Sequence, residues 1–173
     1  MKNIVFALSL VGLVSCSTQT VAVDYDRNQN FQEIKEYRFE IAENSMGELD
    51  LKRIQSAIEN ELSTKGMSLQ ETAANQIKIL PAEYISKTQD SSIGVGVGGG
   101  SHGFGTSIGF GIPINSEKLN QKYLISIYNE RGEMVWEGRL EIQMPANASP
   151  ETREENIVKG VRKLFKNYPP KSK

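Results

Sequence analysis

A β-hairpin in the C-terminal half is the sequence feature that most restricts how this chain can fold. Apolar side chains recur at every second position in segments 122–128 and 133–142, which flank the turn-like sequence Asn129-Glu130-Arg131-Gly132. A period of two is typical of strands, and Asn and Gly favour the tight turn between them. In the second strand the apolar side chains share one face: Met134, Trp136, Leu140 and Ile142. Charged side chains alternate with them, so one sheet face is expected to be core and the other to face water.

Three further segments have strand-like patterns. Residues 21–25 alternate between apolar and small or acidic side chains, and residues 37–41 repeat this pattern. Both segments are predicted to be half-buried strands. Segment 76–86 is also rich in apolar residues, but it contains Pro81. Because proline cannot donate to a sheet ladder, this segment is predicted to be an edge strand or a strand with a bulge.

Two segments have the period of an amphipathic helix. Between Asp50 and Gly66 the apolar residues lie at i, i+3, i+7 and i+11: Leu51, Ile54, Ile58 and Leu62. Asp50 is a candidate N-cap, and Gly66 is suited to the left-handed residue past the end. The second helix opens with Ser149 and Pro150, which suit an N-cap and a first turn. Its apolar stripe comprises Ile157, Val158, Val161, Leu164 and Phe165.

These elements predict an α+β fold. We expect a two-layer sandwich in which a mainly antiparallel sheet carries two amphipathic helices on one face. The chain has 173 residues, which is about one domain at ~150 residues per domain. Its net charge of -1 lacks the basic surplus that nucleic-acid binding requires, so no nucleic-acid partner is expected.

The N-terminus has the pattern of a targeting segment. An apolar run from Ile4 to Val14 follows Lys2, and as a helix it would span ~16 Å, about half of a ~30 Å hydrocarbon core. This length is typical of a signal peptide rather than a membrane span. The run ends at Cys16, the only cysteine of the chain. The tetrad Leu13-Val14-Ser15-Cys16 resembles the bacterial lipobox, in which the cysteine is acylated and becomes the first residue after cleavage.

The lipobox resemblance implies an address and an anchor. Residues 1–15 are expected to be removed as a signal peptide. No cofactor is expected, and the predicted modification is a covalent lipid such as palmitate on Cys16. More than one acyl chain makes such an anchor effectively permanent. The residue that follows the acylated cysteine is Ser17 and not an aspartate. In lipoproteins of the enterobacterial kind, this implies transport to the periplasmic face of the outer membrane. Residues 16–20 are expected to form a short tether.

Several short motifs, in order, resemble one family. They are Val23-Asp24-Tyr25-Asp26 with Phe31, Lys65-Gly66 after the first helix, Val135-Trp136-Glu137-Gly138, and Phe165-Lys166-Asn167-Tyr168-Pro169-Pro170. Together they are similar to the bacterial lipoprotein family called domain of unknown function 4136, over residues 21–170. The resemblance implies an envelope lipoprotein with a compact α+β domain and no established catalytic residues. Such domains commonly end in Phe-Pro-Pro, whereas this chain has Tyr-Pro-Pro.

A glycine-rich insertion lies at about residues 93–114 and contains nine glycines. It formally contains G-x-G-x-x-G, but no helix start follows, so nucleotide binding is not expected. The segment is either a loop or ordinary hairpin, or a contact segment that touches lipid or another chain. The side chains that would make such contacts are Val95, Val97, Phe104, Ile108 and Phe110.

The remaining polar candidates are weak. Asp24 and Asp26 share one strand face, but a metal site would need further oxygen ligands, and Asp26 is well placed to cap the following turn. His102 lies among glycines and is expected to be an exposed loop residue. Trp136 is expected to be a core anchor on the hairpin. No catalytic residue and no metal ligand is therefore predicted.

Three functions remain open on these grounds. The first is a non-enzymatic envelope lipoprotein whose domain binds another envelope component near the membrane. The second is a carrier or sensor of a small apolar ligand, which predicts a cavity of ~300 Å³ or more lined by Leu62, Trp136 and Phe165. The least favoured is an envelope hydrolase that uses Asp24 and Asp26.

Overall fold

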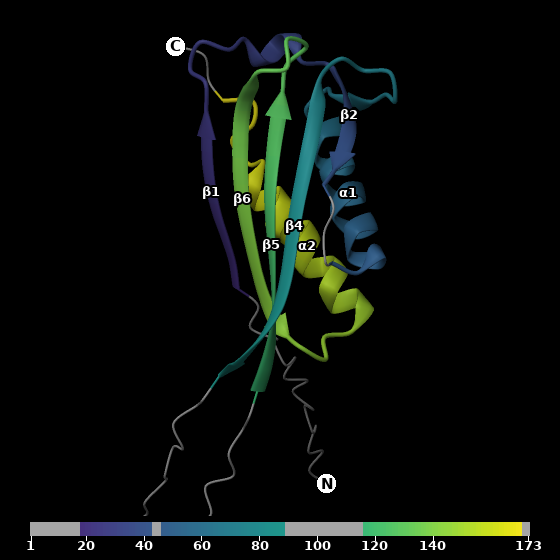
Figure 1. Cartoon of the computed structure of the whole chain (residues 1–173), viewed down its shortest axis with the longest axis vertical. Coiled ribbons are helices and arrows are strands. Elements are labelled where there is room, and N and C mark those ends of the chain that lie inside the picture. Colours follow the sequence, from purple (N-terminus) through teal and green to yellow (C-terminus); the bar gives the residue numbers. More distant parts are fainter. Residues whose placement is uncertain (1–17, 43–45, 89–115, 171–173) are drawn as a thin grey trace, which may run out of the picture.

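A computed structural model describes residues 18–42, 46–88 and 116–170 (Figure 1). These described residues form nine elements in order: β1 (Thr18–Tyr25), a 3-10 turn η1 (Phe31–Glu33), β2 (Glu36–Ile41), α1 (Glu48–Ser63), β3 (Ser68–Leu69), β4 (Gln76–Thr88), β5 (Ser116–Tyr128), β6 (Met134–Pro145) and α2 (Pro150–Leu164). The predicted α+β class is confirmed. β1 begins within the predicted tether at 16–20, so the folded part starts closer to Cys16 than expected.

The six strands form one mixed sheet in the order β1-β6-β5-β4-β2-β3. β1, β6, β5 and β4 pair antiparallel, whereas β2 pairs parallel with both β4 and β3. The prediction of a mainly antiparallel sheet was therefore wrong. The reason is that α1 follows β2 and carries the chain back along the sheet, so that β4 runs in the same direction as β2.

The predicted hairpin is confirmed, with longer strands than the sequence pattern indicated. Its turn is closed by the Gly132 N–H, which donates to the Asn129 carbonyl at 2.9 Å, and Gly132 has a φ of +76°. The register shifts between Ile127 and Tyr128 because one extra residue of β6 is inserted there. As a result Met134 is 51% exposed rather than part of the core face.

Pro81 lies in β4, which pairs with β5 along its whole length and with β2 only over Gln76–Ile79. The strand is thus interior in its first part and an edge in its second part. Pro81 falls just beyond the end of β2, where no strand needs its missing N–H. The predicted edge character is correct for this half alone, and the β4–β5 register has no bulge.

The helices differ in how they begin. In α2, the Ser149 hydroxyl accepts from the Thr152 N–H at 3.3 Å, as predicted for an N-cap. In α1, the N-cap is Gly47 without a side-chain bond, so the assignment of Asp50 as a cap was wrong. Asp50 lies inside the first turn and is buried. After α1, Gly66 has the predicted left-handed conformation with a φ of +80°.

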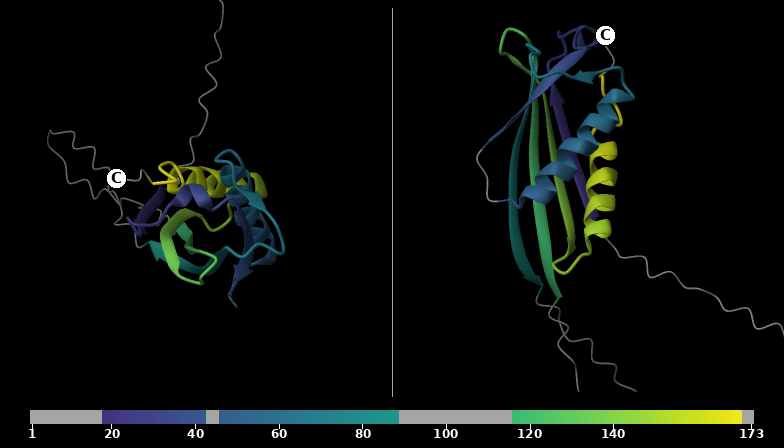
Figure 2. Two further views of the ribbon diagram at one scale, coloured as in Figure 1. Left: turned by 90° about the horizontal axis from the view of Figure 1, so that it is seen from above. Right: turned by 90° about the vertical axis from the view of Figure 1, so that its right-hand side faces the viewer.

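Both helices lie on the same side of the curved sheet (Figure 2). Their apolar stripes share one core cluster with the strands. Trp136 is 2% exposed and stacks on Phe165 with ring centroids 4.9 Å apart, which confirms its role as a core anchor. The opposite face of the sheet carries no helix of the described chain.

Candidate functional site

One end of the sheet gathers the start of the domain and the borders of the glycine-rich segment (Figure 1). In register, Thr18 of β1 lies opposite Gln143 of β6, which lies opposite Asn120 of β5, which lies opposite Tyr84 of β4. β4 and β5 extend four residues beyond this row, to the paired residues Thr88 and Ser116. The two residues that border segment 89–115 therefore lie at the same end of the sheet as Thr18, where β1 begins. We call this end of the sheet, with Thr18, Thr88 and Ser116, the anchor end.

Most of the predicted site residues lie outside the described residues. This holds for the lipobox positions Leu13, Val14, Ser15 and Cys16, and for Ser17. It also holds for His102 and for the contact candidates Val95, Val97, Phe104, Ile108 and Phe110. Their predicted roles stay predictions.

Near the anchor end, the helix-free face of the sheet is hollowed by a pocket of about 170 Å³. It is lined across four strands by Thr18, Thr20, Tyr84, Asn120, Gln121, Lys122, Glu141, Ile142 and Gln143. Lys122 Nζ lies 3.1 Å from Glu141 Oε1 and 5.6 Å from the centre of the Tyr84 ring. The Glu141 hydrogen bond and charge, followed by Tyr84, raise the pKa of Lys122. This surface offers an exposed aromatic ring, a cation and a carboxylate together.

Asn120 organises the floor of this pocket. Its amide oxygen accepts from Gln143 Nε2 at 2.9 Å, and its amide nitrogen donates to the Ser86 hydroxyl at 2.8 Å. Asn120 is only 8% exposed although it lies on the helix-free face. Because the Asn120 amide is hydrogen-bonded within the sheet, the polar groups of the pocket that stay open to solvent lie on its rim.

A second polar group is buried on the covered face. Asp50 is 2% exposed and accepts hydrogen bonds from Arg53 Nη1 at 2.5 Å, from Gln121 Nε2 at 2.7 Å, and from Arg153 Nη1. These partners come from α1, β5 and α2. Burial of a carboxylate is tolerated because two guanidinium groups balance its charge.

The same network continues into the sheet. Gln121 Nε2 also donates to Glu83 Oε2 at 2.9 Å, and its oxygen accepts from the Tyr123 hydroxyl at 3.2 Å. Burial, followed by the charges of Asp50 and Glu83, raises the pKa of Tyr123 far above its usual value, so the hydroxyl remains a neutral donor. The network joins both helices to β4 and β5, and its contacts are internal.

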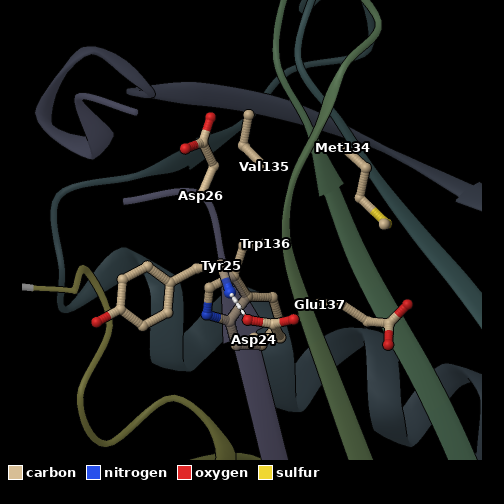
Figure 3. Close-up of a pocket in the computed structure, with 7 residues that line it drawn as sticks. All are labelled: Asp24, Tyr25, Asp26, Met134, Val135, Trp136 and Glu137. Carbon is tan, nitrogen blue, oxygen red and sulfur yellow. Dashed lines mark hydrogen bonds between the residues drawn. The ribbon is translucent and has the colours of Figure 1, made fainter. Parts of the chain in front are cut away.

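The two aspartates considered for catalysis line a pocket of about 260 Å³ at the other end of β1 (Figure 3). Asp26 Oδ1 accepts from the Asn28 N–H at 2.8 Å, which makes it the predicted turn cap. Asp24 Oδ1 accepts from the N–H of Tyr25 at 2.9 Å. Figure 3 shows the two carboxylates apart and on different sides of the residues drawn. The arrangement gives no facing pair for acid and base chemistry.

Asp24 has an acidic cross-strand partner, Glu137 on β6. Glu137 is in turn bonded to Arg139 at 2.8 Å. Within the described ranges, no group of three or more His, Cys, Asp or Glu side chains is arranged to hold a metal ion.

The side chains expected to line a ligand cavity are instead packed together. Leu62 and Phe165 are fully buried, and Trp136 stacks on Phe165. An added Cβ on Gly138 would lie 2.3 Å from Trp136 Cη2, so the indole already occupies the space above this glycine. The pocket that Trp136 borders is lined by neither Leu62 nor Phe165. The packing therefore does not favour the carrier hypothesis.

Sequence reasoning missed two features of this molecule. The spacing of Asp50 and Arg53 is a signal for a helical ion pair, but Arg153 lies 103 positions away and carries no local signal. The helix-free pocket likewise combines residues of four strands, which only the sheet order brings together.

The fold and its surfaces define an α+β domain with one helix-covered and one helix-free sheet face. Within the described ranges, no helix is long and apolar enough to cross a membrane. The chain belongs to the family described as domain of unknown function DUF4136, whose model matches residues 21–170. No curated protein matches the sequence.

The solved structures that are similar to this chain include two proteins. One is a PDZ domain protein from Parabacteroides distasonis, at 17% identity and a TM-score of 0.50, over 92% of this chain and 38% of that one. The chain therefore spans well under half the length of that protein. The other is a PelC dodecamer from Paraburkholderia phytofirmans, at 10% identity and a TM-score of 0.50, over 86% of this chain and 95% of that one. At these identities the similarity shows the fold alone.

Proposed function

We propose that this protein is a non-enzymatic lipoprotein of the bacterial cell envelope, anchored through acylated Cys16, whose domain binds another envelope component close to the membrane. The lipobox places the lipid on Cys16, and Ser17 favours the periplasmic face of the outer membrane. The partner would be a protein of the envelope rather than a nucleic acid, given the net charge of -1.

The observation that carries this proposal is that the anchor end of the sheet lies next to Cys16 in the sequence. β1 begins at Thr18, two residues after Cys16, and two residues reach at most about 7 Å. An anchor at Cys16 would hold this end of the sheet against the bilayer. The pocket lined by Tyr84, Lys122 and Glu141 would then lie beside the membrane, where a partner in the same membrane can reach it.

The anchor is tested by mass spectrometry and fractionation of the full-length protein. We expect Cys16 to carry acyl chains after removal of residues 1–15, and Cys16→Ser to lose both processing and membrane association. The matched control, Ser17→Asp, keeps the acylation site, and in a host with enterobacterial sorting it should move the protein to the inner membrane fraction. A Cys16→Ser protein that is still processed and membrane-bound would contradict the anchor.

The binding surface is tested with a photo-crosslinking residue in intact cells. At Tyr84, which is 48% exposed near the anchor end, we expect cross-links to an envelope component. At Met134, which is 51% exposed at the other end of the sheet, we expect none. Equal cross-linking at both positions would contradict a membrane-proximal site.

A further inference from the structure

Within residues 18–42, 46–88 and 116–170, both edges of the sheet are open over part of their length. β1 forms one edge with eight residues, and six of them are exposed. It contains no Lys, no Pro and no bulge, which are the usual protections of an edge strand. At the other edge, β3 pairs only with Glu36 and Tyr37 of β2, so on the side of β2 that faces away from β4 the described chain leaves Arg38–Ile41 without a neighbouring strand.

The backbone of β1 presents hydrogen-bonding groups outward. The Asp26 N–H donates to the Val135 carbonyl at 2.9 Å, and because direction alternates along a strand, Ala22 and Asp24 also face β6. The intervening residues, including Val21 and Val23, then turn their N–H and C=O groups to the free edge. In agreement, Lys163 Nζ reaches the Gln19 carbonyl at 2.8 Å from outside the sheet.

The backbone of β2 is arranged in the same way. The Arg38 N–H donates to the Asn75 carbonyl at 3.1 Å, and the Ala42 N–H donates to the Ile79 carbonyl at 3.1 Å. These residues face β4, so Phe39 and Ile41 turn their backbone groups outward. Each edge thus has a short row of donors and acceptors that a second strand can complete.

The directions of the edge strands β1 and β2 determine which of them can pair between two copies of the chain. β1 and β2 run in opposite directions, since three antiparallel pairings and one parallel pairing separate them. Placing β1 of one copy beside β2 of the next is therefore antiparallel while both copies keep the same orientation. An antiparallel pair of two β1 strands would instead put the two anchor ends on opposite sides, which one bilayer leaflet does not allow.

We propose that neighbouring copies of this chain join edge to edge, with β1 of one copy paired antiparallel to β2 of the next. This inference rests on the proposed anchoring, which gives all copies one orientation. Anchoring in one leaflet also raises the effective concentration of the edges, so that a short pairing suffices.

The side chains on the β1 and β2 edges are complementary in polarity and charge. On the helix side, Val23 is 45% exposed and Ile41 is 38% exposed, and pairing would bury both. The register that places Val23 opposite Phe39 also places Asp24 opposite Arg38 on the helix-free face. An acidic and a basic side chain then meet across the junction.

Disulfide cross-linking in native membranes tests the pairing. In the same register Ala22 lies opposite Glu40 in a pair without backbone hydrogen bonds, where Cα atoms are about 4.5 Å apart and within reach of a disulfide. We expect co-expressed Ala22→Cys and Glu40→Cys proteins to form a mixed dimer under mild oxidation, and the double variant to form a ladder of larger species. Lys122→Cys, on the helix-free face of the interior strand β5, should stay monomeric. A dimer of Ala22→Cys alone, or monomers throughout, would overturn the proposal.

A proline variant separates edge pairing from chance collision. The Val23 N–H faces away from β6, so Val23→Pro keeps the β1–β6 ladder but blocks an added strand. We expect Val23→Pro to abolish the ladder of the double variant and Val23→Ala to retain it. An undiminished ladder with Val23→Pro would count against strand pairing.

The lipid on Cys16 is measured by mass spectrometry in the same samples. An acylated protein without cross-links refutes edge pairing alone, whereas cross-links on a protein without lipid refute the proposed anchor and leave edge pairing supported.

Discussion

The two faces of the sheet differ in how far their side chains are buried. On the covered face, Trp136, Leu140 and Ile125 are at most 2% exposed and pack against the helices. On the helix-free face, the charged pair of Lys122 and Glu141 is about half exposed. Because apolar burial is the main source of stability, we expect substitutions on the covered face to destabilise the domain and substitutions on the helix-free face to cost little.

The largest effect is expected for Trp136→Ala. Removal of this buried ring leaves a cavity beside Phe165 and should lower the free energy of unfolding by about 3–5 kcal/mol. The matched control is Tyr84→Ala on the helix-free face, which should cost less than about 1 kcal/mol because Tyr84 is 48% exposed. Urea unfolding followed by circular dichroism measures both. Equal losses would mean that the two faces do not differ as described.

The next effect is expected for Asp50→Ala, which leaves Arg53, Arg153 and Gln121 without their shared acceptor. Because both guanidinium groups are about one-fifth exposed, we expect a loss of about 2–3 kcal/mol, somewhat below that of a fully buried pair. Glu48→Ala, in the same helix turn but 79% exposed, is the control and should leave the unfolding temperature nearly unchanged. Thermal unfolding of the pair would reveal whether Asp50 links the helices to the sheet.

A smaller effect is expected for Gly138→Ala. The new Cβ would meet the Trp136 ring at 2.3 Å, so the ring must shift, at a cost of about 1–3 kcal/mol. Gly47→Ala meets nothing within 4 Å and is the control. Near-ultraviolet circular dichroism reports the displaced indole. An unchanged spectrum together with unchanged stability would contradict close packing on the covered face.

The smallest effect is expected for Glu141→Gln on the helix-free face. Loss of this exposed ion pair with Lys122 should leave the stability of the domain nearly unchanged, because solvent screens it. Because Glu141 raises the pKa of Lys122, the variant should lower that pKa toward its ordinary value. A titration of Lys122 by nuclear magnetic resonance measures the shift. A large loss of stability here would show that this face also carries the fold.

Local sequence signals predicted the elements well where the decisive contacts are close in the chain. Ser149 caps α2 through Thr152, and Gly132 closes the hairpin through Asn129, both within a few residues. The apolar stripe of α1 likewise identified the buried Ile54, Ile58 and Leu62. The assignment of Asp50 failed because its partners lie up to 103 positions away, where no local pattern indicates them.

The sequence by itself determined the helices, the hairpin and the amphipathic faces, because hydrophobic period, capping and turn chemistry act over a few residues. It also places Cys16, the predicted lipid attachment site, two positions before Thr18, where the first strand begins. The tertiary structure decided the parallel placement of β2 beside β4, the burial of Asp50 between two arginines, and the gathering of Tyr84, Lys122 and Glu141 at the anchor end. These features depend on the order of strands in the sheet, which is set by packing between distant segments.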